Sequence, residues 1–252
     1  MTCATDKLLS MINAKIKLFF MPYGIKLSVE FIQQIVIINK ANIIMNDTIK
    51  GDKITRAFFD RENAPEIAKA LLGKVLCVQN GEGLSAGIIT ETEAYQGRND
   101  KACHAYGYRR TKRTEVMFGD PGHAYVYLCY GIHQLFNIVT NVKGEPDAIL
   151  IRAVEPIAGL NHILSRRNKK SLKPMDTAGP GKVTQALGIT KNHNQVDLIN
   201  DQIYVLNRPS LDEELLGVSA RIGVDYAEED VDLPWRFYIK GSDFVSKKVT
   251  RG

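Results

Sequence analysis

The chain has 252 residues, 44% of them hydrophobic and 24% charged, and its formal net charge is +5. Such a composition is typical of a soluble globular protein with one sizeable core, and it gives no indication of a second domain. The mild excess of positive charge favours an anionic partner such as nucleic acid without requiring one. The four cysteines lie far apart with no CxxC pair, which favours reduced thiols in a cytoplasmic protein over a zinc cluster or a disulfide framework.

The first 44 residues differ from the rest of the chain, because they are rich in Ile, Asn and Lys. Polar residues, Pro or Gly interrupt every apolar run well before the roughly 20 residues that a membrane span requires. No small-residue cleavage site follows a clean apolar core, which argues against a secretory signal. We therefore expect residues 1–44 to be an N-terminal extension and residues 45–252 to form the folded domain. The alternative is an amphipathic helix that binds a membrane or a partner.

The remaining sequence predicts strands joined by short turns, with few helices between them. Pro65 is placed to start a helix through residues 66–72, which Gly73 would end. Alternating and β-branched runs predict strands at 74–79, 84–95, 123–131, 135–141, 147–156, 201–207, 218–226 and 236–241. Two further helices are expected at 156–167 and 182–188. This order predicts an α+β fold, a single domain around a mostly antiparallel β-sheet with a few flanking helices.

The stretch ETEAYQGRNDKACHAYG, residues 91–107, combines two glutamates, two tyrosines and a histidine with no obvious lysine or serine nucleophile. It begins as a β-branched strand and continues into a loop that starts near Gly97. Sites are often built at such places, because the strand fixes position and the loop provides access. We therefore expect a functional site at the end of this strand.

A second cluster of aromatic residues lies in AYVYLCYG, residues 124–131. Tyr125 and Tyr127 share one face of the predicted strand, and Tyr130 lies on the other face just before Gly131. Packing in the core is the usual role of such tyrosines. Flat side chains also stack on a nucleobase that has been drawn out of a double helix, so both interpretations stay open at this point.

Two basic segments are candidates for phosphate binding. The first, residues 108–114, adjoins the expected site and contains Arg109, Arg110, Lys112 and Arg113. The second, residues 165–173, is equally well explained as a solvated run of charges. Lys182 follows Gly-Pro-Gly at a predicted helix start, where backbone N–H groups favour an anion. The spacing differs from that of a Walker loop, which argues against ATP binding.

These stretches together resemble one known family. The run ETEAYQGRNDKACHAYG, followed by MFGDPGHAYVYLCYGIHQLFNIVT, AILIRAVEP, GPGKVTQALGI, ARIGVDYA and RFYIKGS, is similar to the bacterial form of the alkyladenine (3-methyladenine) DNA glycosylases. The resemblance covers about residues 53–247 with all blocks in order, and residues 1–44 lie outside it. It implies a monomer with a curved antiparallel sheet. It also implies excision of alkylated purines from double-stranded DNA, in base-excision repair in the bacterial cytosol, with no cofactor, metal or membrane involved.

The resemblance also implies roles for single residues. Glu93 matches the general base that activates water, since cutting an N-glycosidic bond passes through an oxocarbenium-like sugar that a carboxylate stabilises. With water as the nucleophile, the enzyme would be monofunctional and leave an abasic site. The residues that match the pocket for the extruded base are Tyr95, His104, Tyr127, Asn137, Leu150 and Arg152. Tyr130 matches the wedge that fills the vacated gap. The expected contacts to the DNA backbone are Arg109, Arg110, Arg113 and Lys182.

Two other classes of protein remain as alternatives. A non-catalytic nucleic-acid binding module would keep the basic and aromatic residues but would not need Glu93. A carbohydrate hydrolase would use two carboxylates, and Glu91 and Glu93 lie on one strand face at roughly 7 Å, which leaves that geometry possible. His123 and His133 have no three-ligand zinc spacing and are expected at the surface or in turns. Ile132 and His133 also depart from the family pattern beside the wedge, which leaves the range of lesions open.

Overall fold

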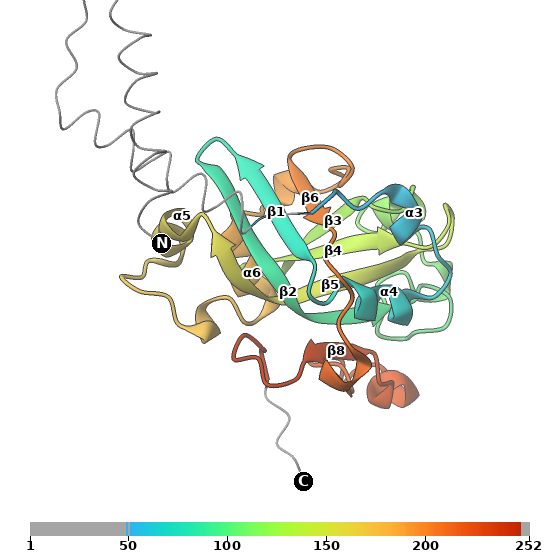
Figure 1. The fold of residues 1–252 in the computed structure, drawn as a ribbon. Helices are drawn as coiled ribbons and strands as arrows, with labels where there is room; N and C mark the ends of the chain where they lie inside the picture. Colours follow the sequence, from blue (N-terminus) through green and yellow to red (C-terminus); the bar gives the residue numbers. More distant parts are fainter. Residues whose placement is uncertain (1–48, 50, 248–252) are drawn as a thin grey trace, which may run out of the picture. The chain divides into compact units, whose positions relative to one another are not determined.

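The computed structural model describes residue 49 and residues 51–247. Within residues 51–247, four α-helices flank one eight-stranded sheet that is not closed into a barrel (Figure 1). The predicted α+β fold is therefore confirmed. The predicted extension, residues 1–44, lies outside the described residues. In the described part of the chain, no helix has the length and hydropathy needed to span a membrane.

The elements follow the order expected for most of the chain. The strands are β1 (Val75–Asn80), β2 (Gly83–Tyr95), β3 (Ala124–Cys129), β4 (His133–Thr140), β5 (Asp147–Ala158), β6 (Ile203–Leu206), β7 (Leu216–Ser219) and β8 (Arg236–Ile239). The helices are α3 (Arg56–Phe59), α4 (Ala64–Leu71), α5 (Leu160–Arg167) and α6 (Pro180–Leu187). Short 3₁₀ turns, among them Glu115–Phe118, lie in the connections.

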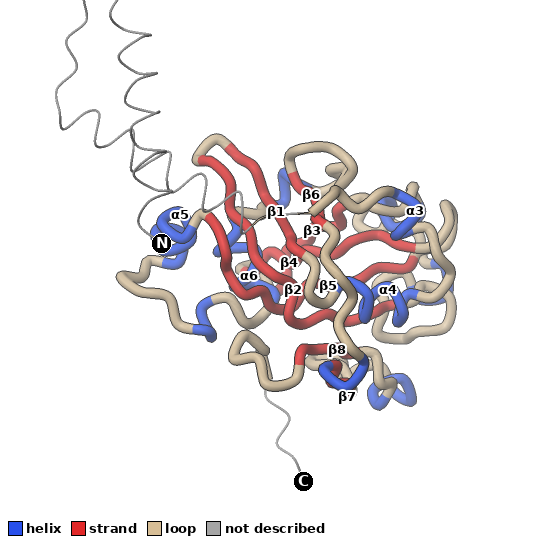
Figure 2. The backbone as a smooth tube through the Cα atoms, viewed as in Figure 1, coloured by secondary structure: helices blue, strands red, loops and turns tan. Residues whose placement is uncertain are grey.

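The sheet runs in the order β3-β4-β5-β2-β1-β6, and every pair of neighbouring strands is antiparallel (Figure 2). The long strand β2 pairs with β5 along one edge. Along its other edge it pairs first with β1 and then, from Glu91 to Glu93, with β8. Irregular pairing between β2 and β5 occurs beside Glu91, a site where a bulge bends the strand. The second half of β2 therefore separates from β1 and joins β8.

Helix α4 covers one face of the second half of β2. Its buried residues, among them Ile67 and Leu71, join the main core, and Asn63 caps its first turn by accepting a hydrogen bond from Glu66 N at 3.2 Å. The Thr92 hydroxyl donates to the backbone oxygen of Ala68 in this helix at 2.9 Å. Because side chains alternate along a strand, the residues on either side of Thr92 point to the opposite face. That face carries the expected site.

One strand prediction and one helix prediction differ from the structure by more than two residues in their bounds. The predicted strand at 218–226 is wrong beyond Ser219, because its antiparallel partner β8 begins at Arg236, opposite Ser219, and Gly223 has a φ of 77°. The predicted helix at 156–167 begins only at Leu160, since β5 keeps pairing with β2 as far as Ala158. The short helix α3 was not predicted, because four residues are too few to show a helical pattern.

Candidate active site

The register of the sheet places the site residues in one row. Tyr125 in β3 lies opposite Asn137 in β4, and Asn137 lies opposite Leu150 in β5. Leu150 lies opposite Glu93 in β2, and Glu93 lies opposite Arg236 in β8. Side chains that are directly opposite one another project from the same face of a sheet. Residues far apart in the sequence are therefore brought together on one face by strand pairing alone.

Glu93 is the fourth residue of this row and is fully buried. Its Oε2 atom accepts hydrogen bonds from the Tyr95 hydroxyl at 2.8 Å and from Arg152 Nη1 at 3.1 Å. Its Oε1 atom accepts from the backbone N–H of Ile222 at 2.8 Å. An ionised carboxylate has about four acceptor positions, so roughly one remains for a water molecule or a substrate group.

Glu91, two residues earlier on the same face, is held differently. Its Oε1 accepts from Arg152 Nε at 3.1 Å, Arg236 Nε at 2.7 Å and the Ser246 hydroxyl at 2.7 Å. Its Oε2 accepts from the Ser246 backbone N–H at 2.5 Å. Burial alone would raise the pKa of Glu91, but Arg152 and Arg236 hold the pKa below its usual value. Glu91 is therefore an ionised carboxylate whose acceptor positions are filled.

A cavity of about 960 Å³ opens on this face of the sheet. Glu93 itself does not line it, but its three partners Tyr95, Arg152 and Ile222 do. It is lined by residues from β3, β4 and β5, by the loop after β2 and by the start of α6. Of the residues expected at the site, ten line it, namely Tyr95, His104, Arg109, Arg113, Tyr127, Tyr130, Asn137, Leu150, Arg152 and Lys182. The structure thus brings together residues that the sequence places almost ninety positions apart.

Three aromatic rings form one wall of the cavity. The ring centroids of His104 and Tyr127 are 4.7 Å apart at an angle of 78°, and those of Tyr125 and Tyr127 are 5.3 Å apart. His104 Nδ1 lies 2.8 Å from the Tyr125 hydroxyl. Tyr125 and Tyr127 share a face of β3 as the alternation of that strand predicts. The face of each ring is apolar and flat, and it suits a planar ligand.

Arg113 lies over this aromatic wall. Its guanidinium carbon is 4.5 Å from the centroid of the Tyr127 ring, and its Nη2 lies 3.2 Å from His104 Nε2. A guanidinium only donates hydrogen bonds, so we assign the proton of the neutral imidazole to Nδ1, which then donates to Tyr125. Burial, and to a lesser degree the charge of Arg113, lower the pKa of His104 to about 4. His104 is thus uncharged at neutral pH.

Asn137 and Leu150 form the part of the cavity nearest to the sheet. Both are buried, with 4% and 3% of their surfaces exposed. Asn137 Nδ2 donates to the backbone oxygen of Tyr125 at 3.1 Å, which fixes the orientation of the amide. No hydrogen bond to Asn137 Oδ1 is found within the described residues. The amide therefore ties two strands together and still presents an acceptor at the cavity.

Tyr130 occupies the tip of the hairpin between β3 and β4, at the rim of the cavity. Its side chain is 91% exposed, and its backbone adopts a φ of 49°, which is uncommon for a residue with a side chain. Ile132, on the same tip, is 74% exposed. A large exposed apolar tip is costly in water, and such tips often mark a contact surface. Tyr130 is thus not a core residue.

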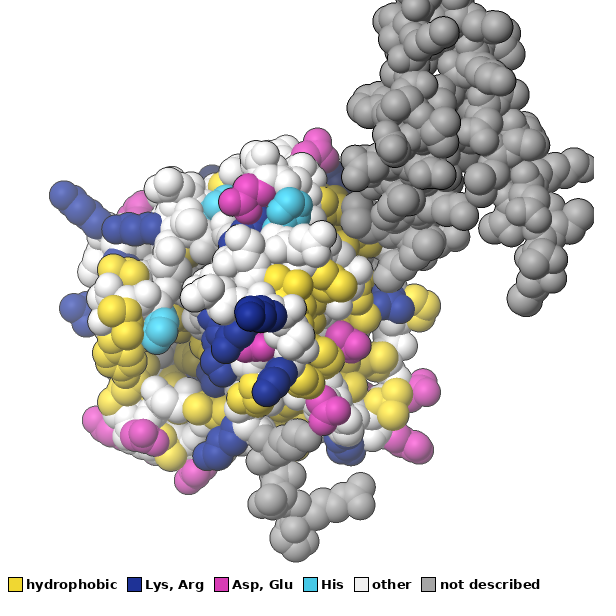
Figure 3. Space-filling view, turned by 90° about the vertical axis from the view of Figure 1, so that its left-hand side faces the viewer, with side chains coloured by type: hydrophobic (Ala, Val, Ile, Leu, Met, Phe, Trp, Pro, Cys, Tyr) yellow, Lys and Arg dark blue, Asp and Glu magenta, His cyan; other side chains and the backbone are white. Residues whose placement is uncertain are grey.

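The basic residues expected to contact DNA fall into two groups. Arg109, Arg113 and Lys182 line the cavity, and Lys182 donates through Nζ to the Met175 backbone oxygen at 2.8 Å. Arg110 does not line it, because its guanidinium pairs with Glu115 at 2.6 Å and lies over the Phe118 ring. The face that includes α5, on the left of Figure 1, also gathers Lys and Arg side chains beside apolar ones (Figure 3).

Several residues that support the site were not singled out from the sequence. Arg221 is buried, forms a two-pronged ion pair with Asp100 at 2.5 and 2.7 Å, and lies 4.8 Å from the centroid of the Tyr95 ring. Arg236 and Ser246 hold Glu91 as described above. The blocks ARIGVDYA and RFYIKGS contain both arginines, but only the register shows what they contact.

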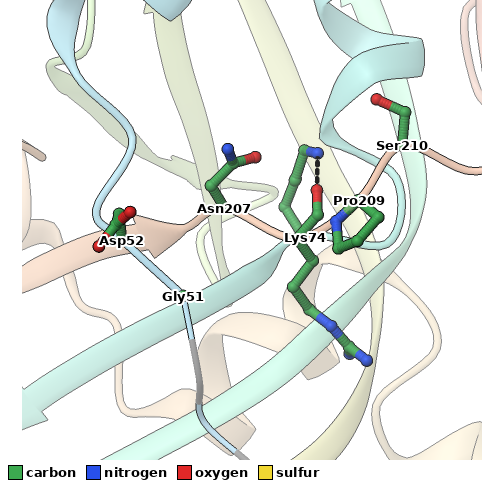
Figure 4. Close-up of a pocket in the computed structure, with 7 residues that line it drawn as sticks. Gly51, Asp52, Lys74, Asn207, Pro209 and Ser210 are labelled. Atoms are coloured by element: carbon green, nitrogen blue, oxygen red, sulfur yellow. Dashed lines mark hydrogen bonds between the residues drawn. The ribbon is translucent and has the colours of Figure 1, made fainter.

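A smaller cavity of about 380 Å³ lies between the start of the described chain and the segment after β6 (Figure 4). Lys74 reaches into it and donates a hydrogen bond to the backbone oxygen of Arg208. It has no aromatic side chain and contains none of the expected site residues. We assign it no part in the reaction.

No group of three or more His, Cys, Asp or Glu side chains suited to a metal ion occurs among residues 51–247. His123 donates through Nδ1 to the Asp120 backbone oxygen at 2.8 Å, directly after the turn at Pro121 and Gly122. His133 lies at the start of β4 and lines the rim of the cavity.

An aromatic cavity with several arginines beside a buried carboxylate is suited to an enzyme that acts on a nucleobase.

Comparisons with known proteins identify the particular family. The sequence model described as methylpurine-DNA glycosylase matches residues 57–243. A protein of Bacillus cereus (strain G9842) is 49% identical over 194 residues, which is 73% of this chain and 94% of the relative. A protein of Bacillus thuringiensis (strain Al Hakam) is 48% identical over 193 residues, with the same shares of 73% and 94%. Both carry the provisional name 3-methyladenine DNA glycosylase.

The chain belongs to the methylpurine-DNA glycosylase family, because the family match covers most of its length. It is a monofunctional DNA glycosylase, a hydrolase that acts on alkylated bases in DNA repair. The resemblance seen in the sequence is thereby confirmed, and so are the class of enzyme and the kind of substrate that it implied.

Proposed function

We propose that the cavity beside Glu93 receives an alkylated purine extruded from double-stranded DNA, and that Glu93 activates the water that cuts its glycosidic bond. The relatives named as 3-methyladenine DNA glycosylases support 3-methyladenine as one substrate. The single observation that carries the proposal is the position of Glu93, a buried carboxylate with about one acceptor position left, whose partners Tyr95, Arg152 and Ile222 line an aromatic cavity.

The arrangement around Glu93 suits a general base. Arg152 and the Ile222 N–H orient the carboxylate, and the Tyr95 hydroxyl donates to it. A water bound at the remaining position would be polarised for attack on C1′ of the sugar. The negative charge would also stabilise the positive charge that develops on the sugar in the transition state. Alkylation at N3 or N7 already makes the base a good leaving group, so no separate acid is required.

The walls of the cavity suit a planar base. His104 and Tyr127 offer rings for stacking, with Tyr95 on β2 nearby, and Leu150 adds an apolar surface. Asn137 presents an amide whose orientation is fixed by Tyr125, so it would meet the edge of the base with a defined polarity. Stacking is tolerant of base identity, whereas an oriented amide discriminates between edges.

The exposed residues around the rim suit a double helix. Tyr130 projects from the hairpin tip, where it would enter the gap left by the extruded nucleotide and keep the stack filled. Arg109 and Lys182 at the rim would bind the flanking phosphates. Arg110 is a weaker candidate for the same role because Glu115 already neutralises it. We propose that the protein acts as a monomer, which light scattering of its complex with DNA would test.

The direct experiment uses a duplex with one 3-methyladenine and a matched undamaged duplex. We expect release of free 3-methyladenine, and strand breaks at that position after hot alkali, only from the damaged duplex. Binding without release of the base would instead support a non-catalytic binding module. The other alternative, a carbohydrate hydrolase with two catalytic carboxylates, is disfavoured because Glu91 is ionised and its acceptor positions are filled.

A further inference from the structure

The guanidinium of Arg113 occupies the place where a stacked base would lie. Its central carbon lies over the Tyr127 ring at 4.5 Å from the centroid. Stacked aromatic groups have centroid separations of about 4.5–7 Å, so the guanidinium lies in the layer that a base would fill. One Nη atom lies within hydrogen-bond distance of His104, as the edge of a polar ring would. Arg113 thus makes the same two kinds of contact that the cavity offers to a base.

The positive charge of Arg113 has no carboxylate to pair with among the described residues. Among residues 51–247, no carboxylate lies within ion-pair distance of it, whereas the neighbouring Arg110 is paired with Glu115. Its partners in the cavity are an uncharged imidazole and the two phenols Tyr125 and Tyr127, so none of them carries a charge. Its side chain is also exposed at the rim, so it has room to turn outward. An unpaired arginine in this position would be attracted to a phosphate of an approaching DNA strand.

We propose that Arg113 holds the place of the extruded base in the DNA-free protein and leaves it when a DNA phosphate binds the guanidinium. The cavity is then more open to a base when a nucleic-acid backbone is present, and free bases and nucleosides bind a few-fold more weakly than they would without Arg113. Arg113 is a gating residue for the cavity and a phosphate contact in succession. The inference rests on the proposed function, because it takes Tyr127 as the surface on which the base stacks.

Free 3-methyladenine is the probe that separates the two roles, since it has a base but no phosphate. Its binding to the full-length protein is measured by NMR titration for the wild type, Arg113→Ala, Lys112→Ala and Tyr127→Leu. We expect Arg113→Ala to bind the free base about two- to fivefold more tightly, the factor that corresponds to the ~0.5–1 kcal/mol of an exposed cation–π contact. Lys112→Ala removes the same charge one residue away, outside the cavity, and should bind like the wild type.

The same variants are then tested for binding to a duplex that contains an abasic site, at several salt concentrations. Arg113→Ala should bind the duplex more weakly, with a salt slope lower by about one phosphate contact. A gain for the free base together with a loss for DNA is the signature of a residue with both roles. A residue that only binds phosphate would show the loss without the gain.

The remaining outcomes are distinguishable. If Arg113→Ala binds the free base as the wild type does, or less tightly, or if neither binds it measurably, while Tyr127→Leu reduces excision of 3-methyladenine, the gating role is overturned and the proposed function stands. If Tyr127→Leu changes neither base binding nor excision, the base does not stack on Tyr127, and both the gating role and this part of the proposed function are wrong. Circular dichroism of each variant confirms that the comparison is between folded proteins.

Discussion

Arg152 joins the two glutamates of the site, with Nη1 at 3.1 Å from Glu93 Oε2 and Nε at 3.1 Å from Glu91 Oε1. The two carboxylates nevertheless differ in what they have left to offer. The acceptor positions of the Glu91 carboxylate are filled by Arg152, Arg236 and Ser246. The Glu93 carboxylate keeps about one acceptor position free. This difference assigns Glu91 to holding the site and leaves Glu93 for the reaction.

Replacing Glu91 by Gln should destabilise the fold. The neutral amide would remove the negative charge that pairs with two buried guanidinium groups. These belong to Arg236, whose side chain is 2% exposed, and to Arg152. Breaking a buried ion pair by removing one partner costs about 3–5 kcal/mol. We expect a loss of that order in the free energy of unfolding, measured by urea denaturation at pH 7.

Glu229→Gln is the matched control, because Glu229 pairs with Lys101 at the surface and its side chain is 69% exposed. Its effect on the free energy of unfolding should stay below about 1 kcal/mol. Equal losses in the free energy of unfolding for Glu91→Gln and Glu229→Gln would show that the buried ion pairs of Glu91 stabilise the fold no more than a surface pair does.

Replacing Tyr130 by Ser should weaken base extrusion without loss of stability. Because the side chain is 91% exposed, the free energy of unfolding should change by less than about 0.5 kcal/mol. Loss of the wedge should disfavour the extruded state by an amount on the order of a few kcal/mol. Fluorescence of a base analogue at the lesion measures the extrusion equilibrium. Val142→Ser, at an exposed apolar position outside the cavity, is the control, and equal fluorescence in both variants would remove the wedge role.

Replacing Asn137 by Ser should relax the selection against guanine. The N2 amino group of guanine, which adenine lacks, would meet the oriented amide, and the resulting steric clash costs about 1–3 kcal/mol. Excision of guanine from a mispaired duplex should rise more than excision of 3-methyladenine changes. Because the amide also bonds to Tyr125, a parallel loss of both activities would mean that Asn137 only supports the strands.

His104 should titrate far below its usual range. Burial and Arg113 lower its pKa to about 4, so we expect NMR titration to give a value near that, and Arg113→Ala to raise it. In the unfolded chain His104 binds a proton with a pKa near 6.5, whereas in the folded protein it is protonated only near pH 4. Stability should therefore fall as the pH decreases through this window, by at most about 1.4 kcal/mol per pH unit from this group. A His104 pKa that Arg113→Ala leaves unchanged would contradict the contact between them.

The fold class and most elements could be predicted, because hydrophobic alternation and turn residues are local signals. The helix through Pro65 and the long strand that ends at Tyr95 follow from such signals. The end of β7 could not be predicted, because residues 220–226 alternate like a strand. The end of β7 is set by the short partner strand β8. Beyond it, Arg221 binds Asp100 and the Ile222 N–H binds Glu93 instead of continuing the sheet.

The sequence could name the candidate residues of the site but could not predict their contacts. The resemblance to a family named the residues, and ten of them line one cavity. Their neighbours depend on register, which the sequence does not specify. The row from Tyr125 to Arg236 arises from four strand pairings, and the contrast between Glu91 and Glu93 arises from Arg236 and Ser246, which come from the C-terminal part of the chain.

The central claim is that Glu93 activates the water, and Glu93→Gln tests it most directly. The amide keeps the size of the side chain, and its single oxygen can accept from either Arg152 or the Ile222 N–H, which bond to different oxygens of Glu93, but it cannot take a proton from water. Single-turnover excision of 3-methyladenine is measured at saturating enzyme, together with binding to a duplex that contains an abasic site analogue. The account predicts that excision slows by about 10²-fold or more while binding stays close to that of the wild type. Excision at a near-normal rate by the folded variant would contradict it.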